Sequence, residues 1–126
     1  MSNGRVVLLV EDEALIALYL EELMSELRIR FVGPVATMAE AVRQARTAKI
    51  DAAVLNWIIE GQPAHAVAEA LDDRGIPFGF ASGALKASVD PKWANRPFVT
   101  KPYTLDGLRD LLNALLGNAS TSSQPA

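Results

Sequence analysis

Five short apolar runs, separated by stretches with helical periodicity, limit the fold of this 126-residue chain more than any other feature. The first and third runs are apolar at nearly every position, which is typical of strands that are covered on both faces. The runs therefore predict five short, buried strands. The predicted strands cover residues 6–10, 31–36, 52–55, 78–81 and 98–100.

The gaps between these runs carry apolar residues at the three- and four-residue spacing of a buried helical face. Weaker patterns predict an alanine-rich helix over 38–49 and a helix over 63–71 whose first turn contains Pro63. The two clearest stripes are formed by Ile16, Leu20, Leu23 and Leu27 and by Leu105, Leu108, Leu112 and Leu115.

This alternation of strands and helices predicts an α/β fold, a doubly wound five-stranded parallel sheet with right-handed crossovers. Between residues 83 and 96, Pro91 interrupts a stretch with poor apolar spacing, so we expect a fourth helix to be short or absent. Residues 118–126 are small and polar and have nothing to bury. We therefore expect one domain over residues 1–117 and a disordered polar tail.

Composition argues against several classes of protein. The 12 basic and 15 acidic residues are dispersed and give a net charge of −3, which disfavours nucleic acid as a partner. The chain has no cysteine, so it can form neither a disulfide nor a thiolate metal site. It also lacks a secretory pattern and any apolar stretch of membrane-spanning length. We expect a cytoplasmic protein that does not contact membranes.

Polar side chains follow four of the predicted strands. Glu11 and Asp12 come after the first, Asn56 after the third, Ser82 after the fourth and Lys101 after the fifth. Each alone has a simpler role as a helix cap or a solvated side chain. In an open parallel sheet, however, ligands bind beyond the carboxyl ends of the strands. Together these residues favour a site at that rim.

Four motifs in a specific order accompany this rim: VVLLVEDE at 6–13, DAAVLN at 51–56, FASG at 80–83 and FVTKPY at 98–103. In this order they resemble the receiver domains of two-component response regulators, over about residues 4–117. The resemblance implies a signalling domain rather than an enzyme. Its partner would be a histidine kinase, a phosphotransfer protein or another signalling protein.

The resemblance also implies a Mg²⁺ site at the rim. Glu11 and Asp12 would help to hold the ion, the backbone carbonyl of Ile58 would be a further ligand, and Asn56 could offer its amide oxygen. Oxygen ligands beside an open face suit this ion, which keeps several waters.

Three further roles follow from the same resemblance. Ser82 would hydrogen-bond a transferred phosphoryl group, and Lys101 would neutralise its oxygens. Phe98 would swing inward as the switch residue, with a static core aromatic as the alternative. The Lys101–Pro102 bond resembles the cis peptide of the family.

A narrower resemblance concerns PFGFASG and RPFVTKPY, which are similar to a group of single-domain α-proteobacterial receivers marked by Phe-Ala-Thr-Gly. Some of that group work in stress-response phosphorelays. Here Ser82 replaces the threonine and keeps its hydroxyl, whereas Ala84 stands where a larger residue is common.

Asn56 departs from the family, whose aspartate at this position accepts the phosphoryl group. A neutral amide is not the anionic oxygen nucleophile that this transfer requires. Asp51 begins the strand roughly 16 Å away and Glu60 is a loop residue, so neither is a substitute. We expect a phosphorylation-independent pseudo-receiver, or an ordinary receiver whose aspartate has been replaced, with weak Mg²⁺ binding in either case.

Other functions remain as alternatives. A flavodoxin-like cofactor binder would need a glycine- and hydroxyl-rich loop after the first strand, where this chain has the acidic EDEAL. A hydrolase is disfavoured because His65 is the only histidine. Trp93, Phe98 and Tyr103 could form a partner surface or ordinary packing. A homodimer through that region or through the first helix also stays open.

Overall fold

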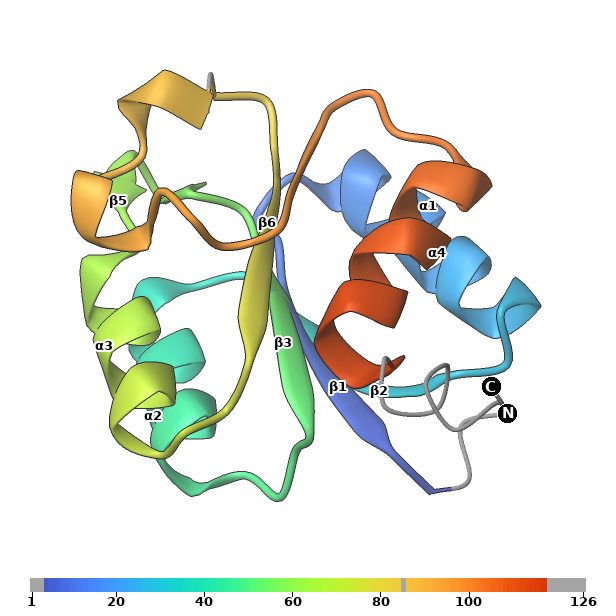
Figure 1. Ribbon diagram of the computed structural model, residues 1–126, viewed down its shortest axis with the longest axis horizontal. Helices are drawn as coiled ribbons and strands as arrows, with labels where there is room; N and C mark the ends of the chain where they lie inside the picture. The colour runs from blue at the N-terminus through green and yellow to red at the C-terminus, as the bar shows by residue number, and fades with distance from the viewer. Residues whose placement is uncertain (1–3, 85, 118–126) are drawn as a thin grey trace.

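The computed structural model describes residues 4–84 and 86–117 and shows a central sheet between two layers of helices (Figure 1). All neighbouring strands of the sheet are parallel, in the order β2-β1-β3-β6-β7. This confirms the doubly wound fold, and each strand begins and ends within one residue of its predicted bounds. The strands are β1 (Val6–Val10), β2 (Arg30–Val35), β3 (Ala52–Leu55), β6 (Phe78–Ser82) and β7 (Phe98–Thr100).

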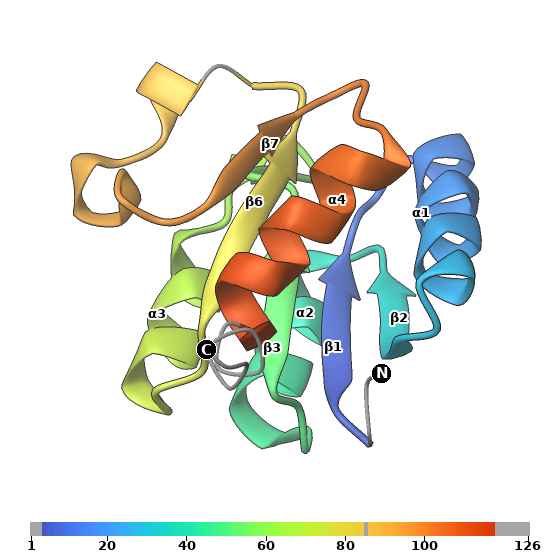
Figure 2. The same ribbon diagram turned by 45° about the vertical axis from the view of Figure 1, so that its right-hand side comes forward.

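Two helices cover each face of the sheet (Figures 1 and 2). The stripes predicted for the first and last helices face inward, where Leu20, Leu23, Leu108 and Leu112 are buried. The last helix continues as a π-helical turn over Asn113–Gly117. One face carries α1 (Ala14–Glu26) and α4 (Leu105–Leu112), and the other carries α2 (Met38–Thr47) and α3 (His65–Asp73).

A small antiparallel hairpin, β4 (Ile58–Ile59) and β5 (Gln62–Pro63), lies between β3 and α3. The prediction that Pro63 begins the third helix was therefore wrong, because this residue pairs with Ile58 and the helix begins at His65. Glu60 and Gly61 have φ values of 54° and 77°, which turn the chain back on itself before the helix can start.

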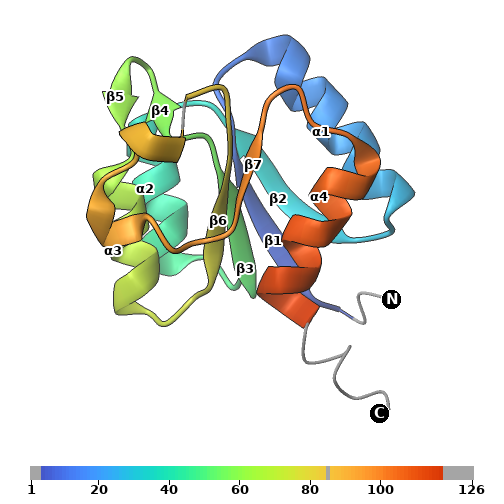
Figure 3. The ribbon, with the colours of Figure 1, turned by 45° about the horizontal axis from the view of Figure 1, so that its top comes forward.

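The connection from β6 to β7 contains two short 3₁₀ turns, Lys86–Ser88 and Pro91–Trp93, in place of a fourth helix, as the sequence predicted (Figure 3). Three ion pairs join this connection to one side of α3. The pairs are His65 with Asp90 at 3.6 Å, Glu69 with Lys92 at 3.9 Å and Asp72 with Arg96 at 2.8 Å.

The aromatic residues of this region are packing residues rather than an exposed surface. Trp93 is buried against the layer of α2 and α3, whereas Tyr103 is buried on the opposite face of the sheet with α1 and α4. Phe98 is half-buried. Packing is therefore the role of Trp93 and Tyr103, whereas a partner surface in this region stays a prediction.

Two further sequence predictions concern the C-terminal tail and membrane-spanning segments. The predicted tail, residues 118–126, lies outside the described residues. Within the part of the chain that the structure describes, no helix is both long enough and apolar enough to cross a membrane.

Candidate functional site

Three polar residues are buried at one end of the otherwise apolar strands. Glu11, Asn56 and Ser82 expose 2%, 7% and 0% of their surface. They come together because β1, β3 and β6 are neighbours in a parallel sheet, so that their carboxyl ends meet at one rim. The predicted convergence of side chains at this rim is therefore present.

The amide of Asn56 joins the other two residues. Its Oδ1 accepts a 2.7 Å hydrogen bond from the Ser82 hydroxyl, and its Nδ2 donates to Glu11 Oε2 at 3.4 Å. This orientation suits both neighbours, because the carboxylate can only accept and the hydroxyl has one proton to donate. Asn56 is thus a donor toward the acid and an acceptor toward the alcohol, and an aspartate could not fill both roles.

Ser82 is fully engaged. While its hydroxyl donates to Asn56, its Oγ accepts from the backbone N–H of Trp57 at 3.3 Å and of Ala84 at 3.2 Å. The hydroxyl therefore uses its donor and both acceptor positions within the chain. It ties the segments that follow β3 and β6 to each other.

Lys101 closes the rim from β7. Its Nζ lies 2.8 Å from Glu11 Oε1 and 2.7 Å from Glu13 Oε1, and its side chain is only 10% exposed. Burial alone would lower the pKa of Lys101, but the hydrogen bonds to Glu11 and Glu13 outweigh it and hold that pKa above its usual value. The Lys101–Pro102 peptide bond is cis, as predicted.

Glu13 is the site residue that the sequence did not identify. It stands at the N-cap position of α1, yet its side chain makes no capping hydrogen bond and pairs with Lys101 instead. The three consecutive acids after β1 were the only signal, and the contact joins residues that are 88 positions apart.

An open pocket of about 300 Å³ lies at the rim. Glu11 does not line it, because this carboxylate is buried behind the pocket. Phe98 does not line it either, since its ring packs 6.1 Å from the ring of Phe80. The lining residues are Asp12, Glu13, Asn56, Ile58, Ser82, Gly83, Ala84 and Lys101.

Comparisons with known proteins agree with this arrangement. The solution structure of SdrG from Sphingomonas melonis Fr1 is 44% identical to this chain, covers 92% of it and 99% of its own length, and superposes with a TM-score of 0.80. The receiver domain of the sensor histidine kinase PA1611 from Pseudomonas aeruginosa, with magnesium in its active-site cleft, is 21% identical over 90% and 98% of the two chains (TM-score 0.77).

The response regulator PhyR from Brucella abortus is 27% identical over 94% of this chain and 50% of its own (TM-score 0.75). The chain belongs to the receiver domains of response regulators. A scan of protein-family models and a search of curated proteins give no match.

The pocket of the receiver offers the kind of oxygen ligands that a divalent cation prefers, but few of them are free to bind one. Asp12, Glu13 and Asn56 present carboxylate and amide oxygens, which suit Mg²⁺. Glu11 is occupied, because Oε1 bonds to Lys101 while Oε2 accepts from Asn56 and from the N–H of Glu13. Within the described ranges, no three acidic or histidine side chains converge as a metal cluster.

Proposed function

We propose that this receiver domain signals by protein contact, without accepting a phosphoryl group at Asn56. The carrying observation is the amide itself, whose oxygen is bonded to Ser82 and whose nitrogen faces Glu11. A neutral amide oxygen that already accepts a hydrogen bond is a poor nucleophile toward phosphorus. The polar side chains at the rim therefore bond to one another, with Asn56 joined to Ser82 and Glu11, and no phosphoryl group is required to hold them together.

Helix α1 supports contact with another signalling protein. Leu15 and Leu18 are 79% and 58% exposed on this helix, beside Tyr19 at 38%. Their spacing of three and four residues puts them on one face of the helix, and a contiguous exposed apolar patch is typical of an interaction site. The partner is a histidine kinase, a phosphotransfer protein or another signalling protein, and a relative from Bartonella quintana is described as the anti-anti-sigma factor PhyR.

A homodimer through α1 is the less favoured alternative. Glu21, Glu22 and Glu26 line a groove on this helix together with Leu18 and Tyr19. Two copies that met through this groove would bring like charges together, which is unfavourable at close range. A partner with basic residues would not meet this repulsion.

We further propose weak Mg²⁺ binding at the pocket, through Asp12 and Glu13 with the amide oxygen of Asn56 and the backbone carbonyl of Ile58. With Glu13 included, three carboxylates (Glu11, Asp12 and Glu13) and the ammonium of Lys101 give the bare rim a formal charge of −2. That charge favours a cation. Binding stays weak because Asn56 adds an amide where a receiver with aspartate has a third open carboxylate.

Beryllofluoride tests the proposal that Asn56 does not accept a phosphoryl group, because beryllofluoride mimics this group and coordinates a carboxylate oxygen. A second solution structure of SdrG, 43% identical to this chain, is of the BeF₃-activated conformation. With Mg²⁺ and beryllofluoride, ¹⁹F spectra of the wild-type chain should show no bound fluoride, whereas Asn56→Asp should show it. Bound beryllofluoride in the wild type would contradict the proposal.

A further inference from the structure

We infer that the β4–β5 hairpin couples the acidic loop after β1 to the N-terminus of helix α2, with Glu60 as the connecting residue. This coupling rests on contacts of Asp12, Glu60 and Met38 and not on Asn56, so it stands or falls independently of the proposed function. Glu60 was set aside in the sequence as a loop residue, and the structure gives it two contacts at once.

The first contact joins Glu60 to the acidic loop. The backbone N–H of Glu60 donates to Asp12 Oδ2 at 2.9 Å. Asp12 differs in this from its neighbour Glu11, which is paired with Lys101. The carboxylate at the edge of the pocket is thus held by the turn of the hairpin.

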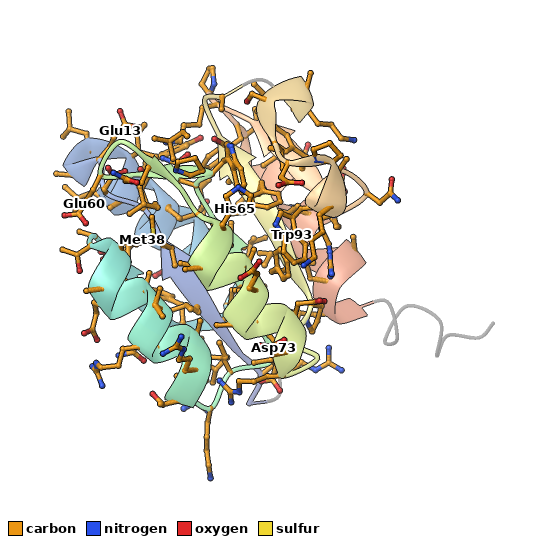
Figure 4. The ribbon with its side chains drawn as sticks, turned by 90° about the vertical axis from the view of Figure 1, so that its left-hand side faces the viewer. Glu13, Met38, Glu60, His65, Asp73 and Trp93 are labelled. Atoms are coloured by element: carbon orange, nitrogen blue, oxygen red, sulfur yellow. The ribbon has the colours of Figure 1, made fainter. Side chains whose placement is uncertain are left out.

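The second contact joins Glu60 to α2. Its Oε1 accepts from the backbone N–H of Met38, the first residue of that helix, at 2.9 Å. Figure 4 shows Glu60 and Met38 on facing sides of this junction, where the hairpin meets the start of α2. A carboxylate here satisfies one of the free donors of the first turn and complements the helix dipole. The hydroxyl of Thr37 separately caps the N–H of Glu40 at 3.2 Å.

The backbone conformation explains why these contacts matter together. Glu60 (φ 54°) and Gly61 (φ 77°) form a two-residue turn with positive φ at both positions. Asparagine, aspartate or glycine is usual at the first of them, and a glutamate there is disfavoured. Its two hydrogen bonds therefore help to hold an otherwise unfavourable conformation, so loss of either one loosens the other.

Adjacent residues of the hairpin differ in how they are held. Ile59 is fully buried in the core, whereas Glu60, the next residue, is exposed. Glu60 is therefore held by its two hydrogen bonds and not by core packing. A ligand that draws Asp12 away from the Glu60 N–H would weaken the hydrogen bond that the Met38 N–H donates to Glu60, which makes the first residue of α2 responsive to the pocket.

Amide hydrogen exchange at Met38 tests the coupling. Asp12→Ala removes the acceptor of the Glu60 N–H without touching α2, and we expect exchange at Met38 to rise about twofold or more. Glu60→Ala removes the cap directly, with an expected rise of about fivefold. Asp12→Asn keeps an acceptor oxygen and should leave Met38 as it is in the wild type.

Two references separate the coupling from a general loss of stability. The Glu40 amide, capped by Thr37, should not change in any of these variants. Asp51→Ala removes an acid that bonds the Val6 N–H at the opposite end of the sheet, and it should leave Met38 unchanged. If Asp12→Ala does not fold, the residue-60 amide in Glu60→Ala reports the same coupling from the other end. Unchanged exchange at Met38 in Asp12→Ala, or at residue 60 in Glu60→Ala, would overturn the inference.

Discussion

The aromatic core beneath the β6–β7 connection and the polar rim at the strand ends are both buried, but they obey different rules. In the core, the rings of Trp57, Phe78 and Phe80 pack edge to face, and no ring depends on one particular partner. At the rim, Glu11 and Asn56 each need specific neighbours. The core is therefore destabilised by a loss of volume, whereas the rim is destabilised by the loss of a partner, because a buried polar group left unpaired is costly.

Trp93→Ala should give the largest loss of stability, because it removes a large ring from the aromatic core. Trp93 is 2% exposed, lies 5.4 Å from the ring of Phe78 and is stacked by the Arg96 guanidinium. Its loss should lower the free energy of unfolding by about 4 kcal/mol in urea denaturation. Trp93→Phe keeps a ring and also removes an indole N–H that has no partner among the described residues, so it should cost less than about 1.5 kcal/mol. Equal losses in the two variants would contradict this difference.

Lys101→Met should give the next largest loss of stability, because it removes the ion pair with Glu11 at the rim. The substitution keeps the length of the side chain but leaves the Glu11 carboxylate, 2% exposed, without its cation. We expect a loss of about 3 kcal/mol in the free energy of unfolding. Arg43→Met, which removes the cation of an exposed pair with Glu40, serves as the control and should change little. A similar result for both variants would argue against a special role of the rim.

The same lysine makes stability depend on pH. Because the pKa of Lys101 is raised in the folded state, its contribution is complete below the ordinary lysine pKa of about 10.4 and is lost as pH rises through the folded value. Burial first, and the charge of Glu11 second, also raise the pKa of Tyr103. Unfolding followed from pH 9 to 12 should show falling stability, and Lys101→Met and Tyr103→Phe should each flatten the slope.

Asn56→Asp should give a smaller loss of stability, which measures the repulsion between carboxylates at the rim. The carboxylate would replace the amide that now donates to Glu11, and the rim would change from −2 to −3. In EDTA we expect a loss of about 2 kcal/mol in the free energy of unfolding, and Mg²⁺ should restore it. Asn95→Asp, at an exposed loop position, makes the same charge change away from the rim. Equal melting temperatures of wild type and Asn56→Asp in EDTA would count against the repulsion.

Most of the fold could be predicted because its signals are local or periodic. The strands of residues 6–10 and 52–55 match the observed bounds because a strand covered on both faces is apolar at successive positions. The edge strand of residues 98–100 also matches its predicted bounds, although its residues are only half-buried or exposed. Pro63 was misplaced because proline is common in a first helical turn, while the turn at Glu60 and Gly61 lacks the usual Asn-Gly sequence.

The candidate site was predictable only as far as the strand ends. Glu11, Asn56, Ser82 and Lys101 meet because the topology places the ends of their strands together. The pairing of Glu13 with Lys101 and the contact of Glu60 with Met38 depend on the positions of loops, which the periodicity of the sequence does not specify.

Intact mass after incubation with Mg²⁺ and acetyl phosphate tests most directly the central claim that Asn56 alone blocks phosphoryl transfer. The wild-type chain should keep its mass, and Asn56→Asp should gain about 80 Da, the mass of one phosphoryl group. Asn56→Asp combined with Lys101→Met should gain little. A gain of mass in the wild type, or none in Asn56→Asp, would contradict the claim.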